Sequence, residues 1–368
     1  MDSCDALIVG GGPAGSSCAW GLRRSGLDVA ILDRRSFPRN KVCGGWITPA
    51  VLEELEIDPA EYARSRVLQP ITGFKTSYIG GPVVETRYGC PVSYGIRRLE
   101  FDDYLLRRSG ARLLDPAPLS SLERSGEQWV VNAQWRTRLL IGAGGTFCPV
   151  ARYLGAKVSG EIVVTAQEAE VEVDSECAIR GEIPELYFCS DMKGYGWCFR
   201  KGNVLNVGLG RLDPHGLSKH SAEFLKFLKA AGRLPRDFSA PLAGHAYLLQ
   251  GNTSRTIVAD GIALIGDAAG VAYAQSGEGI RPAIESGLLA AKVVTQAQGR
   301  YTRERLEAYL DLLRQRSNGA GWAERIGRSV PTRLTCAIAR QLLATQWFTR
   351  DIVLDRWFLR QDEAVLEL

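Results

Sequence analysis

The stretch Asp5-Ala-Leu-Ile-Val-Gly10-Gly-Gly12-Pro-Ala-Gly15 decides the fold, because an apolar strand ends in spaced glycines and then opens a helix. Gly10 allows a tight turn, Gly12 lets a pyrophosphate approach backbone N–H groups, and Gly15 permits close helix–strand packing. Asp33 follows at the distance where a carboxylate accepts hydrogen bonds from ribose hydroxyls. The stretch therefore predicts a βαβ unit that binds a dinucleotide.

A second glycine turn, Gly261-Ile-Ala-Leu-Ile-Gly266-Asp267-Ala-Ala-Gly270, lies far along the chain. It is also an apolar strand that ends in small residues and opens a helix, and it puts Asp267 at a strand end. A plain helix N-cap would explain this aspartate. A second carboxylate that can hold a polyol instead suits the ribityl chain of FAD, which NAD lacks. The two turns together predict an FAD protein.

Composition narrows the class of protein. The chain has 368 residues, enough for one large or two modest domains, and a formal net charge of only +4, which does not favour nucleic acid. Its nine cysteines have neither CxxC nor metal-ligand spacing, which suits a reducing cytosol. Met1 leads straight into a strand without a basic segment, and no apolar run approaches the roughly 18 residues of a membrane span. We expect a cytoplasmic protein, soluble or peripheral on the inner membrane face.

The order of elements predicts an α/β fold. We expect a discontinuous, Rossmann-like FAD-binding domain, an inserted antiparallel β-sheet substrate domain and a helical C-terminal region. The predicted FAD-binding parts are residues 1–78, 95–158 and 255–300; the β-rich parts are 79–94 and 159–254; the helical region is 301–368.

Four motifs resemble those of one flavoprotein family. The two glycine turns are similar to the FAD-binding fold of aromatic hydroxylases, and Arg98-Leu-Glu-Phe101-Asp102-Asp-Tyr-Leu105 resembles a helix start found across these flavoproteins. Lys41-Val-Cys43-Gly44-Gly45 resembles the KxCGG loop of the geranylgeranyl reductase family. Gly266-Asp267-Ala-Ala-Gly270 with Ser276-Gly277-Glu278-Gly279-Ile280, and Tyr195-Gly-Trp197-Cys-Phe199, resemble two further blocks of that family. The resemblance covers about residues 4–300 and implies non-covalently bound FAD.

The chain departs from the family pattern in three places. Gly142-Ala143-Gly144-Gly145 stands where most relatives have Asp-Gly, which argues against a hydroxylase-type NADPH site. Ala274 replaces a proline ahead of the GEGI block, and Arg200 replaces the proline after the aromatic strand. Arg200 either pairs with an anionic head group at the pocket edge or faces water.

The resemblance assigns roles around the flavin. A helix that starts near Gly277–Gly279 would direct free N–H groups and partial positive charge at the flavin. Glu278 either contributes there or is simply a first-turn acid. Arg98 would reach the pyrophosphate or ribityl chain, or lie on the surface, and Leu119 would present backbone groups to the adenine. The full set of predicted cofactor-binding residues is Gly10, Gly12, Ala14, Gly15, Asp33, Arg34, Cys43, Gly44, Arg98, Leu119, Gly266, Asp267, Gly277, Gly279 and Ile280.

Cys43 is the predicted catalytic residue. If the resemblance holds, its thiol faces the isoalloxazine ring, where it could donate a proton, tune the flavin or form a transient adduct. The alternative is an inert, packed cysteine.

The substrate pocket is predicted to be apolar. Tyr195, Trp197 and Phe199 alternate along one strand, so their rings share a face; this face is either core or a pocket wall for a long apolar substrate. The tail Ile338–Leu359 could lie on a membrane, on its own domain or on a second subunit. The predicted substrate residues are Trp46, Tyr195, Trp197, Phe199 and Arg200.

We therefore expect a flavoprotein oxidoreductase that reduces C=C bonds of a prenyl or other extended apolar substrate by hydride transfer from reduced flavin N5. No second nucleotide fingerprint is present, so electrons would come from NADPH, ferredoxin or a quinol. The alternative is an FAD monooxygenase or halogenase-like enzyme acting on an aromatic or natural-product scaffold. Cys336 is the only cysteine after Cys198, which excludes a C-terminal four-cysteine iron–sulfur cluster.

Overall fold

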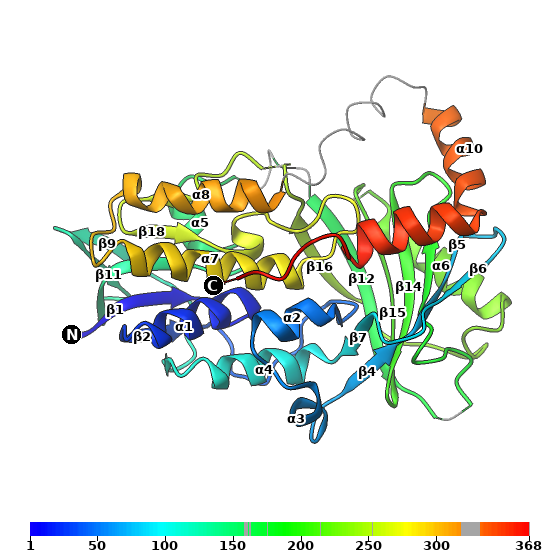
Figure 1. Cartoon of the computed structure of the whole chain (residues 1–368), viewed down its shortest axis with the longest axis horizontal. Helices are drawn as coiled ribbons and strands as arrows, with labels where there is room; N and C mark the ends of the chain where they lie inside the picture. The colour runs from blue at the N-terminus through cyan, green and yellow to red at the C-terminus, as the bar shows by residue number, and fades with distance from the viewer. Residues whose placement is uncertain are drawn as a thin grey trace.

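The molecule is elongated, with two large sheets that follow one another along its long axis (Figure 1). The computed structural model describes residues 1–157, 161, 163–174, 176–213, 215–251, 253–317 and 332–367. Residues 318–331 of the predicted helical region lie outside this part of the chain. Within it, no helix combines the length and the apolar character needed to cross a bilayer.

The first sheet has a parallel, Rossmann-like centre. β1 pairs in parallel with β2 on one side and β11 on the other, and β11 pairs in parallel with β18. Ala6, Leu7 and Ile8 of β1 are fully buried, as expected for a strand covered on both faces. The strands are β1 (Asp2–Val9), β2 (Val29–Leu32), β8 (Arg112–Leu113), β9 (Leu122–Ser125), β10 (Gln128–Val131), β11 (Trp135–Gly142), β17 (Val258–Ala259) and β18 (Ile262–Leu264).

The second sheet is mainly antiparallel, in the order β16-β12-β15-β14-β13-β5-β6. These pairings and the parallel first sheet confirm the predicted α/β fold class. The domain boundaries stay a prediction, although β5 pairs with β13 and so lies in the second sheet, not with residues 1–78. The strands are β5 (Gly73–Tyr78), β6 (Val84–Arg87), β12 (Val163–Glu172), β13 (Glu185–Phe188), β14 (Gly194–Lys201), β15 (Val204–Arg211) and β16 (Ala243–Leu248).

A small third sheet and the helices complete the fold. The third sheet consists of β3 (Trp46–Ile47), β7 (Ser93–Ile96) and β4 (Leu68–Ile71). The helices are α1 (Pro13–Arg24), α2 (Pro49–Glu54), α3 (Pro59–Ala63), α4 (Arg98–Arg108), α5 (Pro149–Tyr153), α6 (Leu217–Ala230), α7 (Ile280–Gln296), α8 (Arg303–Ser317), α10 (Thr332–Leu343), the 3₁₀ turn η2 (Gly266–Ala268) and the π-helix η4 (Phe348–Phe358).

Small residues let α1 and α7 pack closely beside the first sheet. A Cβ at Gly287 of α7 would collide with the backbone carbonyl of Ala14, and a Cβ at Gly21 would lie 2.8 Å from Cβ of Ala291. Close packing of this kind brings the start of α1 next to the second glycine turn. It joins segments that are more than 250 residues apart in the sequence.

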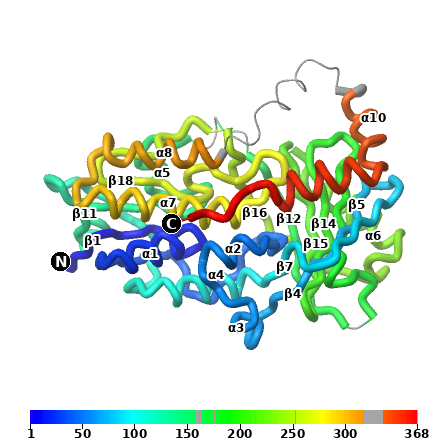
Figure 2. Tube along the Cα trace, viewed as in Figure 1, coloured from blue at the N-terminus to red at the C-terminus, as the bar shows by residue number. Residues whose placement is uncertain are grey.

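The C-terminal segment packs on its own chain. α10 and η4 lie against the second sheet, and the chain then returns towards α7 (Figure 2). Phe358 of η4 is buried and stacks on Trp46, with ring centroids 5.4 Å apart and planes inclined by 7°. Tyr88 donates a hydrogen bond of 2.6 Å to Asp355. Of the three positions predicted for the tail, the structure therefore has the intramolecular one.

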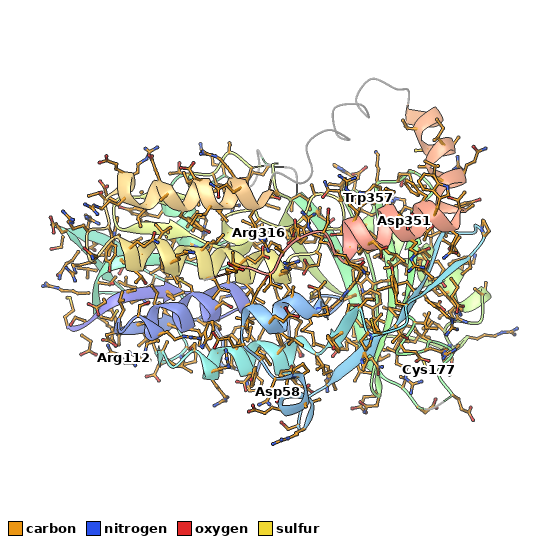
Figure 3. All side chains as sticks on the ribbon, in the orientation of Figure 1. Asp58, Arg112, Cys177, Arg316, Asp351 and Trp357 are labelled. Carbon is orange, nitrogen blue, oxygen red and sulfur yellow. The ribbon has the colours of Figure 1, made fainter. Side chains whose placement is uncertain are left out.

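A buried cluster of charges holds the end of the chain against α7. Arg281 of α7 is 2% exposed and pairs with Glu54 of α2 and with Glu285. It also donates to the carbonyl of Ala364, as does Arg316, which Figure 3 labels between α8 and the tail. Burial, and then the neighbouring Glu285, raise the pKa of Glu54 above its usual range despite the counter-effect of Arg281.

We predict that Arg281→Met destabilises the protein by about 3–5 kcal/mol, because it leaves two buried carboxylates without their shared cation. Chemical denaturation monitored by tryptophan fluorescence measures the change. The control is Arg303→Met, which removes an exposed pair with Glu307 and should cost less than about 1 kcal/mol. Equal losses in the two variants would contradict the prediction.

Candidate active site

The first glycine turn has the geometry that its sequence predicts. Gly10 has φ +115°, and a Cβ there would collide with the carbonyl of Ala143. A Cβ at Gly15 would collide with the carbonyl of Gly10. Both positions therefore require glycine, which keeps β1, α1 and the end of β11 in direct backbone contact.

The N-terminus of α1 has chemistry suited to an anion. Its N-cap is Gly12, no side chain caps the helix, and Pro13 occupies the first turn. First-turn N–H groups are thus left for a ligand, and the helix dipole adds partial positive charge. Arg39 lies beside this point, with Nη2 3.4 Å from the position of a Cβ on Gly12. A pyrophosphate fits these donors.

The other residues predicted near the adenosine half lie at the ends of the first-sheet strands. Asp33 follows β2 and accepts hydrogen bonds from the amides of Gly11 (2.8 Å) and Arg35 (3.0 Å). Arg34 is exposed, and Leu119 is half-buried against the core of the first sheet. Asp33 thus shapes the glycine turn as well as standing where a ribose would lie.

The second glycine turn meets the first. A Cβ on Gly266 would lie 2.8 Å from Cβ of Ala14, and the Gly266 amide donates to Ser286 of α7 at 2.9 Å. The turn opens only the 3₁₀ turn η2, and α7 begins later, at Ile280. The expectation that this turn opens a long helix is therefore wrong: Gly270 and Gly277, both with positive φ, interrupt the helical path.

Asp267 lies among cationic groups. Its Oδ2 is 3.6 Å from Nε2 of His245, and Lys41 Nζ is 2.6 Å from the same ring nitrogen. Burial opposes ionisation of Asp267, but His245 and Lys41 together lower its pKa. Burial lowers the pKa values of Lys41 and His245. The ionised carboxylate can accept hydrogen bonds from a polyol, and the cations suit a neighbouring diphosphate.

Arg98 is committed to an intramolecular partner. It is buried and forms two hydrogen bonds to Asp102, of 2.7 and 2.8 Å, and its guanidinium also interacts with Cys43. The alternative of a surface arginine is wrong. Its contact with the pyrophosphate or ribityl chain stays a prediction, while the structure itself has Arg98 linking α4 to the Cys43 loop.

The start of α7 differs from the sequence-based expectation. Gly279 is the N-cap, and Glu278 accepts hydrogen bonds from the amides of Ile280 (2.9 Å) and Arg281 (3.0 Å). The N–H groups that were expected to be free are therefore partly occupied by a carboxylate. Burial raises the pKa of Glu278 to about 7, although these two hydrogen bonds oppose the shift. Gly277 has φ +69° and leaves no room for a Cβ beside Tyr247.

The loop from Lys41 to Gly45, which we call the Cys43 loop, bridges the two sheets. The Cys43 amide donates to Glu168 of β12 at 2.6 Å. Asn206 of β15 donates to the Cys43 carbonyl at 3.4 Å, and Lys201 of β14 donates to the Gly44 carbonyl at 3.1 Å. Sequence analysis missed the three side chains that hold this loop. Charged residues at inward positions of otherwise apolar strands were the available signal.

The aromatic residues of β14 share one face, as predicted. Trp197 lies over Gly208, where a Cβ would have no room, and donates to Asn206 at 2.6 Å. Phe199 lies against Gly44, 3.2 Å from the position of a Cβ there, and edge-on to Trp46. Phe358 covers part of this face, edge-on to Tyr195 at 5.3 Å. The aromatic face therefore adjoins the Cys43 loop.

Arg200 does not belong to this face. It alternates with Phe199 and Lys201, so it points to the opposite side of the sheet, where Cys198 packs against Phe224 of α6. Its Nε donates to the carbonyl of Gly202 in the hairpin turn. The prediction of a cation at the pocket edge is wrong for this residue, because strand alternation turns it away.

A parallel nucleotide sheet and an antiparallel sheet, joined at a glycine-rich cysteine loop, define a flavin-dependent oxidoreductase. Residues 5–75 match the family model described as FAD dependent oxidoreductase. The chain is 31% identical over 324 residues to a menaquinone reductase from Mycobacterium tuberculosis (80% of this chain, 77% of the relative). It is 27% identical over 310 residues to a digeranylgeranylglycerophospholipid reductase from Methanocaldococcus jannaschii (80% and 78%).

Solved structures share the whole fold. A geranylgeranyl bacteriochlorophyll reductase-like protein from Thermoplasma acidophilum superposes with a TM-score of 0.74 at 22% identity, over 99% of this chain and 93% of that chain. A flavin-dependent brominase superposes with a TM-score of 0.69 at 17% identity, over 97% and 92%. The chain belongs to the geranylgeranyl reductase family of FAD-dependent oxidoreductases. This confirms the family, the enzyme class and the FAD cofactor predicted from sequence.

We predict that Asp267→Ala weakens FAD binding at least about tenfold, or ~1.4 kcal/mol, because it removes the ionised acceptor between the two glycine turns. Fluorescence titration of FAD into FAD-free protein measures the dissociation constant. Asp237→Ala, at an exposed position, is the control. An unchanged affinity in Asp267→Ala would refute the assignment of this carboxylate to the cofactor.

We also predict a pH dependence of stability from Glu278. Its folded-state pKa of about 7 lies above the ordinary 4.5, so the folded protein keeps a proton that the unfolded chain loses between these values. Its contribution to the free energy of unfolding is complete below 4.5 and is lost as the pH rises through 7. Glu278→Gln keeps an acceptor oxygen for the two amides and should flatten this fall in thermal-melting series from pH 5 to about pH 8. The exposed Glu172→Gln should leave the profile unchanged; parallel profiles in all three proteins would contradict the prediction.

Proposed function

We propose that this protein uses FAD to reduce C=C bonds in the isoprenoid chain of a lipid-like substrate. The observation that carries the proposal is the aromatic face of β14, which adjoins the Cys43 loop between the two sheets. The named substrates of relatives support it: menaquinone, digeranylgeranylglycerophospholipid and geranylgeranyl diphosphate share a prenyl chain and differ in their head groups. The chemistry common to them is an apolar chain, which suits aromatic walls.

The cofactor would be held by both ends of the first sheet. The uncapped N-terminus of α1 and Arg39 suit the diphosphate, Asp33 the adenosine ribose and Asp267 the ribityl chain. Gly277 and Gly279 allow the backbone at the start of α7 to approach the flavin ring. When bound, FAD supplies the hydride for one carbon of the double bond.

Cys43 is the proposed catalytic residue. A reduced double bond gains a proton at its second carbon, and a thiol held beside the flavin ring can donate it. The neighbouring Arg98 guanidinium would stabilise the thiolate that remains, and water would return the proton.

Trp46, Tyr195, Trp197 and Phe199 would line the substrate chain. Trp46 and Phe199 are buried, and Phe358 stacks on Trp46. A substrate would therefore reach these rings when the side chains of the C-terminal segment move aside. Burial of a prenyl chain there would also exclude water from the reacting carbon.

The electron donor and the site of action belong to the same proposal. The first sheet carries the chain's single nucleotide fingerprint, so NADPH, ferredoxin or a quinol would deliver electrons by transient docking. The exposed side chains of Ile338 on α10 and Trp347 just before η4 support peripheral contact with a membrane. A lipid substrate would be reached most directly from that position.

We predict that reduced, FAD-loaded protein is reoxidised rapidly and without oxygen by one member of a prenyl-lipid panel. Stopped-flow absorbance of the flavin follows the reaction, and mass spectrometry should find a product heavier by two hydrogens per double bond. Saturated analogues of the same lipids are the control, because they cannot accept hydride.

The competing function gives a different outcome. An FAD monooxygenase would be reoxidised by oxygen in the presence of an organic substrate and would form a hydroxylated product, and a halogenase would require halide. Oxygen-dependent product formation, with no anaerobic reoxidation by any prenyl lipid, would overturn the proposed reduction.

A further inference from the structure

Four buried polar side chains lie together on the face of the second sheet that the Cys43 loop contacts. Glu168 and Glu170 come from β12, Lys201 from β14 and Asn206 from β15. Lys201 and Asn206 are fully buried and Glu168 is 6% exposed. Cross-strand pairing sets Glu168 beside Gly208 and Trp197, and Glu170 beside Asn206. The four residues form one row on the same face as the aromatic side chains.

The row binds the backbone of the Cys43 loop on both sides of the cysteine. Glu168 accepts the Cys43 N–H, Asn206 donates to the Cys43 carbonyl and Lys201 donates to the Gly44 carbonyl. Gly44 and Gly45 give this loop little rigidity of its own, and Gly45 has φ +69°. Tertiary hydrogen bonds must therefore set the position of Cys43.

The charges in the row do not cancel. Lys201 pairs with Glu170 at 3.0 Å, which leaves the carboxyl of Glu168 as the excess acid. Its second oxygen is buried and has no hydrogen-bond partner, and burial raises the pKa of Glu168. An unsatisfied buried oxygen costs stability. A neutral residue could hold a loop more cheaply, so this arrangement points to a role in the reaction.

The Cys43 side chain is approached from the opposite direction. Arg98 interacts with the thiol and is itself held by two hydrogen bonds to Asp102 of α4. The cysteine is therefore gripped between the two parts of the molecule: its peptide groups by the second sheet and its thiol by the first helical layer.

We propose that Glu168, Asn206 and Lys201 are positioning residues for Cys43, which fix its backbone so that the thiol stays beside Arg98 and the flavin. The inference rests on the proposed function, because it matters for catalysis only if Cys43 acts in it. It adds residues from strands that carry none of the recognised cofactor motifs. Loss of either charged member should free the loop and expose the thiol.

The test measures the alkylation rate of Cys43 in FAD-loaded protein, using iodoacetamide and peptide mass spectrometry. Glu168→Ala and Lys201→Met should raise this rate at least about threefold, because a half-buried thiol becomes accessible when its loop is released. The rate at the exposed Cys90 should not change and provides an internal reference. Glu168→Gln keeps an acceptor for the Cys43 amide and should restore most of the wild-type rate.

Matched controls separate positioning from general loss of stability. Glu172→Gln lies on the same strand as Glu168, and Lys193→Met lies just before β14; both positions are exposed. Neither should alter the rate at Cys43. A lowered melting temperature in Glu168→Ala and Lys201→Met with an unchanged rate at Cys43 would overturn the proposal. If Glu168→Ala fails to fold, Lys201→Met and Glu168→Gln still decide.

Turnover distinguishes this inference from the proposed function. With an accepted prenyl lipid, Glu168→Ala should lower kcat about tenfold or more and leave KM within about twofold, because the substrate wall is intact. Alkylation needs no substrate. Altered alkylation without any prenyl reduction by the wild type would refute the proposed function alone, whereas wild-type reduction with unaltered alkylation and kcat in the variants would refute the positioning role alone.

Discussion

Direct backbone contact between the two glycine turns is the constraint on which the rest of the structure depends. Side chains at Gly10, Gly15 or Gly287 would collide with neighbouring carbonyls, and Gly266 touches Ala14. With those contacts made, the uncapped N-terminus of α1 faces Asp267, and one dinucleotide can span both turns. The surrounding cations are explained by this geometry, because a diphosphate brings negative charge to a partly buried place.

The Cys43 loop converts the nucleotide fold into a candidate active site. Its residues belong to the first sheet in sequence, yet its hydrogen bonds go to side chains of the second sheet. Because Gly44 and Gly45 impose no conformation, Glu168, Lys201 and Asn206 define where the thiol lies. The loop therefore couples the relative position of the two sheets to the chemistry proposed at their junction.

The C-terminal segment closes the molecule by two different kinds of interaction. Phe358 adds an apolar ring to the aromatic face, whereas Arg281 and Arg316 bind the chain end through Ala364. Apolar packing is non-directional and tolerates sliding, while buried ion pairs hold a unique position. A segment held in this way can cover the aromatic face between turnovers and still yield to an apolar chain of similar chemistry.

The sequence by itself determined the fold class, the family and the FAD cofactor, because glycine spacing and strand–helix patterning are local features that few other structures tolerate. It also predicted that the rings of Tyr195, Trp197 and Phe199 share a face, since alternation along a strand is local too. Only the tertiary structure decided that Glu278 caps α7, that Arg98 pairs with Asp102 and that Arg200 points away from the site. It also brought Glu168, Lys201, Asn206 and His245 to the Cys43 loop. These contacts join residues that are distant in the sequence, and the pairing of strands sets them, which no local pattern encodes.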